Sequence, residues 1–551
     1  MKIALAQLNY HIGNFEQNTA KIIGAIENAK GKGADLVVFA ELCVSGYPPR
    51  DFLDYPEFIA FCERSAAEIA AACTDIACII GLPTVNSKPR GKDLHNSALF
   101  IENGAVKAQV NKALLPTYDV FDEYRYFEPG IEFQCIEFRD YTIALTICED
   151  LWNINDNPLY VSNPMDVLIE EKPDLMINIA ASPFNYSHDE ARIRVLSDNA
   201  KKYDLPLLYV NQVGAHTELI FDGGSLAFAA GGARLFEMPY FEEALQLFSV
   251  EKNVHGKAEL VSPMENTKDR QPDVQQIYGA IVLGIRDYFQ KSGLKQAILG
   301  LSGGIDSAVV CALACAALGP DNVMGVLLPS KYSSDHSVKD AEALAQNLGC
   351  RHAVIPIRDV AASFEKTLEP EFKNLPFNLA EENIQARSRA VLLMAMSNKF
   401  GFVLLNTSNK SEAAVGYGTL YGDMCGAISV LGDVYKTQVY ELARYINRER
   451  ELIPENTIVK PPSAELRPDQ KDSDSLPEYD VLDRILYHYI EERMASQAII
   501  AKGFDEETVL RVLKLVNMAE FKRYQTPPIL RVSPKAFGMG RRMPIVGKYL
   551  S

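Results

Sequence analysis

Short apolar runs alternate with amphipathic stretches through the first half of the chain, and this alternation predicts a layered α/β structure. Between the runs, apolar residues return at helical spacing, as at Ile22, Ile23, Ile26 and Ala29. Strands that alternate with helices in this way are typical of sheets covered by helical layers. The expected strands are IALAQL (3–8), LVVFA (36–40), IACIIGL (76–82), TIALTI (142–147), LMINIA (175–180) and LPLLYVN (205–211).

The pattern changes after about residue 250, where a polar stretch with Pro, Asn and Gly predicts a linker. A helix (VQQIYGAIVLGIRDYFQK) then begins at Val274. QAILGL, SGGIDS, AVVCALACAALG and NVMGVLLP follow as a βαβ unit, and HAVIPI and FVLLN continue a parallel series. We therefore expect a first domain over 1–255, a linker over 256–273 and a second domain over 274–551.

One later segment, PPSAELRPDQKDSDSLPEYD (461–480), is polar and rich in proline. Its composition fits an exposed connection, and a mobile lid is the alternative.

Bulk composition limits the class of protein. A chain of 551 residues is too long for one core. The formal net charge of −17 argues against a nucleic-acid partner. No apolar run reaches the ~18 residues of a membrane span, and the start predicts a strand and not a signal peptide. The ten cysteines include no CxxC pair, which favours reduced thiols in the cytoplasm.

The segment SGGIDS, Ser302–Ser307, carries the first chemical signal. It lacks the lysine and the spacing of a Walker A loop. Two glycines between a strand and a helix let backbone N–H groups approach a phosphate, and two serines add hydroxyl donors. Asp306 would repel a bare phosphate, so we expect it to act through Mg²⁺.

A second signal joins three separate residues. Cys148 and Glu41 each stand at the end of an apolar strand, and Lys112 follows a third stretch. A thiol, a carboxylate and an amine can act as nucleophile, base and oxyanion stabiliser in amide hydrolysis. Alone, Cys148 and Lys112 fit an ordinary core cysteine and a solvated lysine better, and Glu41 fits a strand-end surface glutamate equally well.

The sequence around these residues resembles the nitrilase superfamily over about residues 1–250. FAELCVSGYPP, NKALLPTYDVFDEYRYFEPG and ICEDLW match its three motif blocks in order. The resemblance implies an αββα sandwich in which Glu41 is the general base, Lys112 stabilises the oxyanion and Cys148 is the nucleophile. For glutamine it implies binding or supporting roles for Tyr118, Glu128, Ser182 and His188, although relatives often have lysine at the last position.

The second half resembles the ATP pyrophosphatases, and the NAD synthetases among them, through SGGIDS, ENIQARSR (382–389), LLNTSNKSEAAVGYGTLYGD (404–423) and the C-terminal EFKRYQTPPILRVSPKAFGMGRRMPI. The resemblance implies a parallel-sheet α/β domain like the adenine-nucleotide α-hydrolases. It assigns ATP to Gly300, Leu301, Ser302, Gly303, Gly304, Ile305, Asp306, Ser307, Thr407 and Lys436. It assigns deamido-NAD to Asn383, Arg387, Glu412 and Lys522, and Mg²⁺ to Asp306 and Glu412.

Together the halves resemble the glutamine-dependent NAD synthetase family. This resemblance implies a cytoplasmic homo-oligomeric ligase that takes ammonia from glutamine and amidates ATP-activated deamido-NAD, with Mg²⁺ and without a tightly bound organic cofactor. Two alternatives stay open here. The acceptor could be a nucleobase or a tRNA, or the amidase-like half could be a binding module without catalysis.

Overall fold

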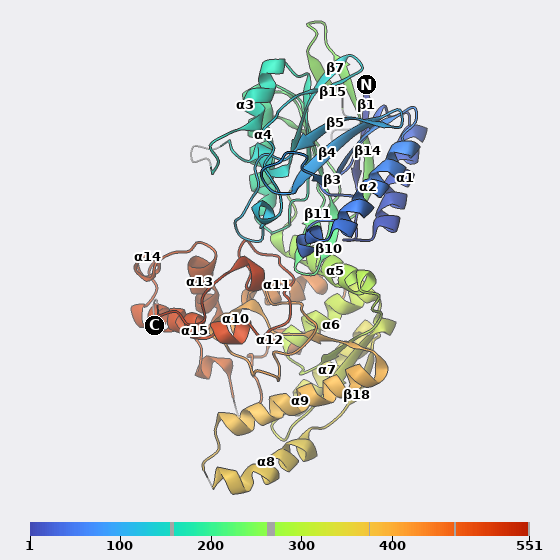
Figure 1. Cartoon of the computed structure of the whole chain (residues 1–551). Helices are drawn as coiled ribbons and strands as arrows, with labels where there is room; N and C mark the ends of the chain where they lie inside the picture. Colours follow the sequence, from blue (N-terminus) through green and yellow to red (C-terminus); the bar gives the residue numbers. More distant parts are fainter. Residues whose placement is uncertain (155–158, 262–269, 374, 468–469, 549–551) are drawn as a thin grey trace. The chain divides into compact units, whose positions relative to one another are not determined.

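The structure is a computed structural model that describes residues 1–154, 159–261, 270–373, 375–467 and 470–548. The chain forms two compact units, Met1–Arg270 and Gln271–Ser551 (Figure 1). Residues 262–269 of the expected linker lie outside the described residues. Residues 258–261 of that linker form the last strand of the first unit, and Asp273 begins the first helix of the second.

Two sheets pack face to face in the first unit. The first has the strand order β15-β14-β1-β2-β3-β4-β5 and the second β13-β12-β9-β8-β7-β6, and β10 and β11 form a separate hairpin. Strand β1 contacts β9 and β5 contacts β7, so one apolar core lies between the sheets. The strands are β1 Lys2–Gln7, β2 Leu36–Val38, β3 Ala77–Val85, β4 Leu94–Glu102, β5 Ala105–Asn111, β6 Ile136–Phe138, β7 Tyr141–Ile147, β8 Leu175–Ala180, β9 Leu207–Asn211, β10 Val213–His216, β11 Leu219–Asp222, β12 Leu226–Phe228, β13 Arg234–Glu237, β14 Ala244–Lys252 and β15 Ala258–Val261.

Helices cover the outer face of each sheet. Helices α1 (Phe15–Gly31) and α2 (Pro56–Ala72) contact the first sheet, and α3 (Pro164–Leu168) and α4 (His188–Tyr203) contact the second. Helix α1 begins where the Asn14 side chain accepts the N–H of Gln17, and its apolar stripe is buried. The expected αββα sandwich is confirmed, because each sheet has one face on the shared core and one under helices.

A single five-stranded sheet organises the second unit. Its order is β18-β17-β16-β19-β20, and every neighbouring pair is parallel. The strands are β16 Ala297–Gly300, β17 Val323–Leu327, β18 Arg351–Val354, β19 Val403–Asn406 and β20 Ile428–Ser429. From β16 the chain adds β17 and then β18 on one side of it, and it then adds β19 and β20 on the opposite side. The carboxyl ends of β16 and β19 therefore form a topological switch point, where α/β sheets bind ligands.

The helices of this unit pack around that sheet and around a second apolar cluster. Helices α5 and α11 contact α6, and α9 contacts β16 and β19. Helices α13, α14 and α15 pack together next to α10. The bounds are α5 Asp273–Lys291, α6 Ile305–Leu318, α7 Asp335–Leu348, α8 Arg358–Phe372, α9 Leu379–Phe400, α10 Lys410–Val415, α11 Lys436–Ile446, α12 Glu455–Val459, α13 Tyr479–Ile490, α14 Ser496–Ile500, α15 Glu506–Met518 and α16 Glu520–Arg523.

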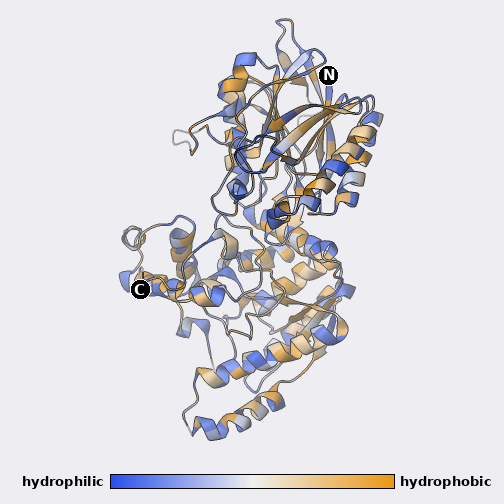
Figure 2. Ribbon diagram, in the orientation of Figure 1, coloured by the Kyte–Doolittle hydropathy of each residue, from blue (hydrophilic) through white to orange (hydrophobic). Residues whose placement is uncertain are grey.

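Hydropathy follows this layering. Figure 2 shows both colours on the surface helices, whereas α6 is apolar along most of its length. Helix α6 is covered by α5, α7 and α11 and by β17, which explains why its sequence has no polar face. Among the described residues, no helix combines the length and the apolar character that crossing a membrane requires.

The buried ion pair of Arg192 and Asp222 yields a test of the first unit's stability. The two side chains form two hydrogen bonds, of 3.0 and 2.7 Å, and are almost fully buried. Arg192→Met leaves the Asp222 carboxylate buried without its partner, so we expect the free energy of unfolding to fall by about 3–5 kcal/mol. Urea denaturation measures this change.

Arg139→Met provides the matched control. Arg139 pairs with Asp35 at 2.7 Å, but its side chain is 51% exposed. An exposed pair contributes about 0–1 kcal/mol. Equal losses of stability in the two variants would contradict the assignment of Arg192 as a buried structural charge.

Candidate active sites

Strand ends carry the three candidate catalytic residues of the first unit. Glu41 follows β2, Lys112 follows β5 directly and Cys148 follows β7 directly. Cys148 has a φ of +43°, a left-handed conformation that is uncommon for a residue other than glycine. The sharp turn from strand to 3₁₀ helix therefore holds this thiol in a strained position, as is common at functional sites.

Lys112 lies at the centre of a buried cluster of charged side chains. Its Nζ atom donates to Glu41 Oε1 at 2.7 Å and to both carboxylate oxygens of Glu123 at 2.8 Å. Lys112 and Glu41 are fully buried. Burial acts to lower the pKa of Lys112, but Glu123 and Glu41 outweigh it and raise that pKa well above its usual value. The lysine is thus a permanent cation.

Two further donors fix the Glu41 carboxylate. Asn96 Nδ2 donates to Oε1 at 2.7 Å, and the N–H of Ala181 donates to Oε2 at 3.0 Å. Asp150 joins the other two catalytic segments: its carboxylate accepts the N–H groups of Ala113 and Leu114, next to Lys112, and that of Ile147, next to Cys148. The structure therefore brings Glu41, Lys112 and Cys148 into one site.

The Cys148 thiol is protonated in this resting site. Burial raises its pKa well above the usual value, Glu41 raises it further, and Lys112 acts in the opposite direction. A protonated thiol is a weak nucleophile and needs an adjacent base. Glu41 is the carboxylate with the largest electrostatic effect on this thiol, which suits it to take the proton.

Glu123, and not Glu128, is the second glutamate of this cluster. Burial raises the pKa of Glu123 to about 7, although Lys112 and a 2.9 Å hydrogen bond from Tyr47 favour its charged form. Glu128 lies elsewhere: its carboxylate accepts the N–H of Lys92 at 3.0 Å, and its carbonyl oxygen contacts His95. Both glutamates occur in one motif block, and spacing alone did not distinguish them.

Another acid beside Cys148 was missed by the sequence analysis. Glu149 accepts hydrogen bonds from the hydroxyls of Tyr118 at 2.9 Å and Tyr160 at 3.1 Å. Burial raises the pKa of Glu149 to about 7. The sequence did hold one indication of Glu149, because this residue directly follows Cys148. The 3₁₀ turn of Cys148–Leu151 keeps the side chains of adjacent residues close together.

Ser182 and His188 lie together as a pair. Ser182 Oγ is 3.0 Å from His188 Nε2, and the Ser182 N–H donates to Asn211 Oδ1 at 2.9 Å. The His188 ring stacks on Trp152, with 5.0 Å between the ring centroids. Trp152 ends the Cys148 turn, so this stack places His188 next to the end of that turn.

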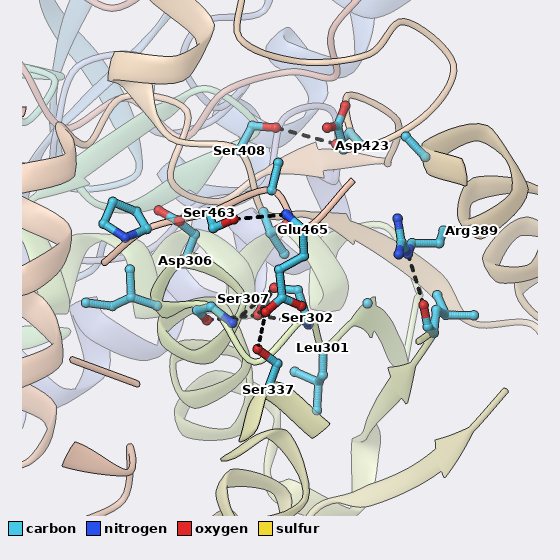
Figure 3. A pocket seen from close by; sticks show the side chains of 18 of the residues that line it. Leu301, Ser302, Asp306, Ser307, Ser337, Arg389, Ser408, Asp423, Ser463 and Glu465 are labelled. Carbon is cyan, nitrogen blue, oxygen red and sulfur yellow. Dashed lines mark hydrogen bonds between the residues drawn. The ribbon is translucent and has the colours of Figure 1, made fainter. Parts of the chain in front are cut away.

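The second unit has a cavity of about 300 Å³ at the switch point between β16 and β19 (Figure 3). All the predicted ATP residues except Gly303 line it. Gly303 has a φ of +80°, and a Cβ atom there would lie 2.3 Å from the carbonyl oxygen of Ser337. Only glycine fits at this position, so it shapes the loop that the other residues present to the cavity.

One lysine lies between two carboxylates in this cavity. Lys436 Nζ is 2.5 Å from Asp306 Oδ2 and 3.4 Å from Glu412 Oε1. Burial and the charge of Asp306 raise the pKa of Glu412 to about 8, even with Lys436 present. Glu412 is therefore mostly protonated at neutral pH, and a cation bound beside it would favour its charged form. Carboxylate oxygens are the ligands that Mg²⁺ prefers, so Asp306 and Glu412 fit such an ion.

The other predicted deamido-NAD residues hold one segment, residues 416–420. Lys522 donates to the carbonyls of Gly416 and Gly418 at 2.8 and 2.7 Å. Thr419 Oγ1 donates to Asn383 at 2.7 Å, and Arg387 Nε donates to Leu420 O at 3.2 Å. This segment continues into Gly422 and Asp423, which line the cavity.

The proline-rich segment after Lys460 also reaches the cavity. Residues 461–466 line it, and Glu465 accepts hydrogen bonds from Ser334 and Ser337 at 3.0 and 2.7 Å (Figure 3). As expected for a connection, Pro461, Ser463 and Ala464 are exposed, but the segment also contributes to the cavity, and residues 468–469 lie outside the described ones. Arg389, another lining residue, donates to Leu328 O at 3.0 Å and was not singled out from the sequence.

Comparison with known proteins identifies a family for each unit and for the whole. The family model of carbon-nitrogen hydrolases matches residues 2–255, and that of NAD synthase matches residues 277–526. A glutamine-dependent NAD(+) synthetase from Synechocystis sp. is 46% identical, with 98% of both chains covered. One from Acinetobacter baylyi is 42% identical over 99% of this chain and 98% of its own. The solved structure of the Acinetobacter baumannii synthetase in complex with ADP is 40% identical, with a TM-score of 0.78 over 99% of this chain and 98% of that one.

Glu123→Gln tests how the buried charges control the thiol. Glu123 is one of the carboxylates that raise the pKa of Cys148, so its neutralisation lowers that pKa. Each unit of decrease raises the thiolate fraction about tenfold. We expect the pH profile of Cys148 alkylation by iodoacetamide, followed by peptide mass spectrometry, to move to lower pH. Glu128→Gln is the matched control, and an equal shift in both variants would contradict the assignment.

Proposed function

The chain belongs to the family of glutamine-dependent NAD(+) synthetases, and on that premise we propose how its residues divide the reaction between two sites. The first unit hydrolyses glutamine to glutamate and ammonia. The second unit activates deamido-NAD with ATP and amidates it to NAD⁺, releasing AMP and pyrophosphate. The observation that carries this proposal is a buried Glu41–Lys112 pair next to Cys148 on the same chain as a cavity lined by SGGIDS.

Hydrolysis begins when Glu41 takes the proton from the Cys148 thiol and the sulfur attacks the amide carbon of glutamine. Lys112 stabilises the oxygen that becomes negative in this step. The C–N bond breaks, ammonia leaves with the proton from Glu41, and a thioester remains. Glu41 then takes a proton from water, whose oxygen attacks the thioester carbon. The C–S bond breaks, glutamate leaves, and the thiolate takes the proton back from Glu41. The hydrogen bonds from Asn96 and Ala181 support this role because they hold the Glu41 carboxylate in place.

Glu149 binds the α-ammonium group of glutamine in this proposal. It is a buried acid beside the nucleophile, held by the hydroxyls of Tyr118 and Tyr160. An ionised carboxylate in a dry pocket attracts a cationic group strongly. Ser182 contacts His188, which stacks on Trp152, and both side chains can donate hydrogen bonds to the α-carboxylate of glutamine.

Amidation takes place in the cavity at the switch point. The nicotinate carboxylate attacks the α-phosphorus of ATP, and pyrophosphate leaves. Ammonia then attacks the carbonyl carbon of the adenylated acid, loses a proton, and AMP leaves. The SGGIDS loop binds phosphate through its N–H and hydroxyl groups. Asp306 and Glu412 would hold Mg²⁺, which neutralises phosphate charge, and Lys436 adds a second cation to the same region.

Asn383, Arg387 and Lys522 position deamido-NAD through the 416–420 segment that they hold. We also propose that the enzyme is a homo-oligomer that works in the cytoplasm. All ten cysteines are free, which suits a reducing compartment. Size-exclusion chromatography with light scattering tests the oligomeric state.

Cys148→Ala separates the two reactions. With Mg–ATP and deamido-NAD, we expect glutamine-dependent NAD⁺ formation to fall by about a thousandfold or more, because the nucleophile is lost. Ammonium-dependent formation should be unchanged, since that step takes place in the other unit. Cys62→Ala, which replaces a buried cysteine of α2, is the control for a general loss of stability. Equal loss with both nitrogen donors would contradict the proposal, as would pyrophosphate release driven by a nucleotide or tRNA in place of deamido-NAD.

The pKa of Glu149 predicts a pH dependence of glutamine binding. Its carboxyl group titrates at about 7 in the folded protein, so the protonated form dominates below that pH and cannot attract an ammonium group. We expect the KM for glutamine to rise as the pH falls through 7.

Tyr160→Phe sharpens this test. The Tyr160 hydroxyl lowers the pKa of Glu149, so its removal moves the rise in KM to higher pH. Tyr141→Phe is the control, because that hydroxyl donates to the carbonyl of Val250. A KM for glutamine that is independent of pH would show that Glu149 does not bind the substrate.

A further inference from the structure

Three cysteine side chains converge in the second unit, outside the cavity at the switch point. Cys311 and Cys315 are one turn apart on α6 and therefore share a face. Cys350 follows α7 and precedes β18. Their three sulfur atoms all lie within 4.8 Å of one another, and Cys311 and Cys350 are 3.8 Å apart. All three are buried and carry free thiols.

This spacing matches the requirements of a thiolate metal site. With metal–sulfur bonds of about 2.3 Å, the sulfurs around a trigonal ion are about 4.0 Å apart. Small rotations of the three side chains would suffice to reach that geometry. Among the described residues, this is the only group of three or more His, Cys, Asp or Glu side chains whose ligand atoms lie this close together.

Two simpler explanations account for less of the arrangement. Buried cysteines often pack as small apolar residues, but that role does not require three sulfurs from two chain segments to meet. A disulfide uses two sulfurs and leaves the third without a purpose. A soft metal ion uses all three, because thiolates are the ligands that such ions prefer.

We propose that Cys311, Cys315 and Cys350 form a binding site for one soft, thiophilic d¹⁰ metal ion of the Zn²⁺ and Cd²⁺ class. Binding forms three metal–sulfur bonds and releases the three thiol protons to solvent. A divalent ion and three thiolates leave one net negative charge. No oxidation or reduction takes place.

The site links a bound ion to the nucleotide loop through α6. Helix α6 begins at Ile305 and carries Asp306 and Ser307 in its first turn, and Cys311 and Cys315 lie further along it. An ion would fasten this later part of the helix to the segment before β18. Because binding favours the folded state, it would raise the unfolding temperature of the second unit. This inference does not depend on the reaction proposed above.

Cadmium titration of the full-length Cys148→Ala protein tests the site, since this background removes the reactive thiol of the other unit. We expect thiolate-to-cadmium charge-transfer absorption that saturates at one ion per chain, together with a higher melting temperature. Adding Cys315→Ser should weaken Cd²⁺ binding by more than about 100-fold, the upper end for loss of a supporting contact alone. Adding Cys62→Ser instead should leave binding unchanged.

Several results would overturn the proposal. These are the absence of charge-transfer absorption in the parent, its full retention in the Cys315→Ser variant, or a thiol count showing that two of the three cysteines are already oxidised. Circular dichroism shows whether Cys315→Ser folds, and Cys350→Ser is the second variant. If neither variant folds, cadmium NMR of the parent decides, because the chemical shift reports how many sulfur atoms bind the ion.

Discussion

The burial of the Lys112 charge constrains the first unit more than any other interaction. An ammonium group with no exposure to water is stable only if carboxylates neutralise it and fill its three donor positions. Glu41 and Glu123 do both, and they come from segments that are far apart in the chain. Their pairing therefore fixes the ends of β2 and β5 against each other. Asp150 extends the same constraint to the end of β7, and so to Cys148.

Topology plays the corresponding part in the second unit. The parallel order β18-β17-β16-β19-β20 leaves a crevice where the chain reverses direction across the sheet. SGGIDS follows β16 and Thr407 follows β19, so both reach the crevice although about a hundred residues separate them. Helix α6 starts at the loop, which directs its N-terminal N–H groups to the same place.

The sequence predicted strands well where the apolar run was long and continuous. β8 occupies residues 175–180 as expected, and α1 buries Ile22, Ile26 and Ala29. The hairpin of β10 and β11 was not predicted, because short strands of mixed polarity have no clear period. Family motifs brought Glu41, Lys112 and Cys148 together correctly, since each motif is local.

Contacts between distant segments were not readable from the chain. Asn96 reaches Glu41 from the third position of β4, and nothing in the sequence of that strand marks it as part of the site. Only the structure shows that the turn after Lys112 directs Glu123, and not Glu128, toward the Lys112 ammonium group. The polar composition of residues 461–466 predicted a connection exposed to water. Residues that line a nucleotide cavity are also polar and in contact with water, so composition alone did not distinguish the two. In each case the missing information was a tertiary contact.

The two sites use the same arrangement, a lysine between two carboxylates, but they differ in access to solvent. The side chains of Glu41 and Glu123 are 1% and 5% exposed, and those of Asp306 and Glu412 are 18% and 17% exposed. The sealed cluster keeps Lys112 charged and excludes water, which suits a reaction where a neutral amide group enters and a proton moves between neighbouring groups. The open cluster lies within reach of water, so a cation can enter and favour the charged form of Glu412, as a reaction on phosphates requires. The difference in burial between the two lysine clusters is therefore the physical basis for their division of chemistry.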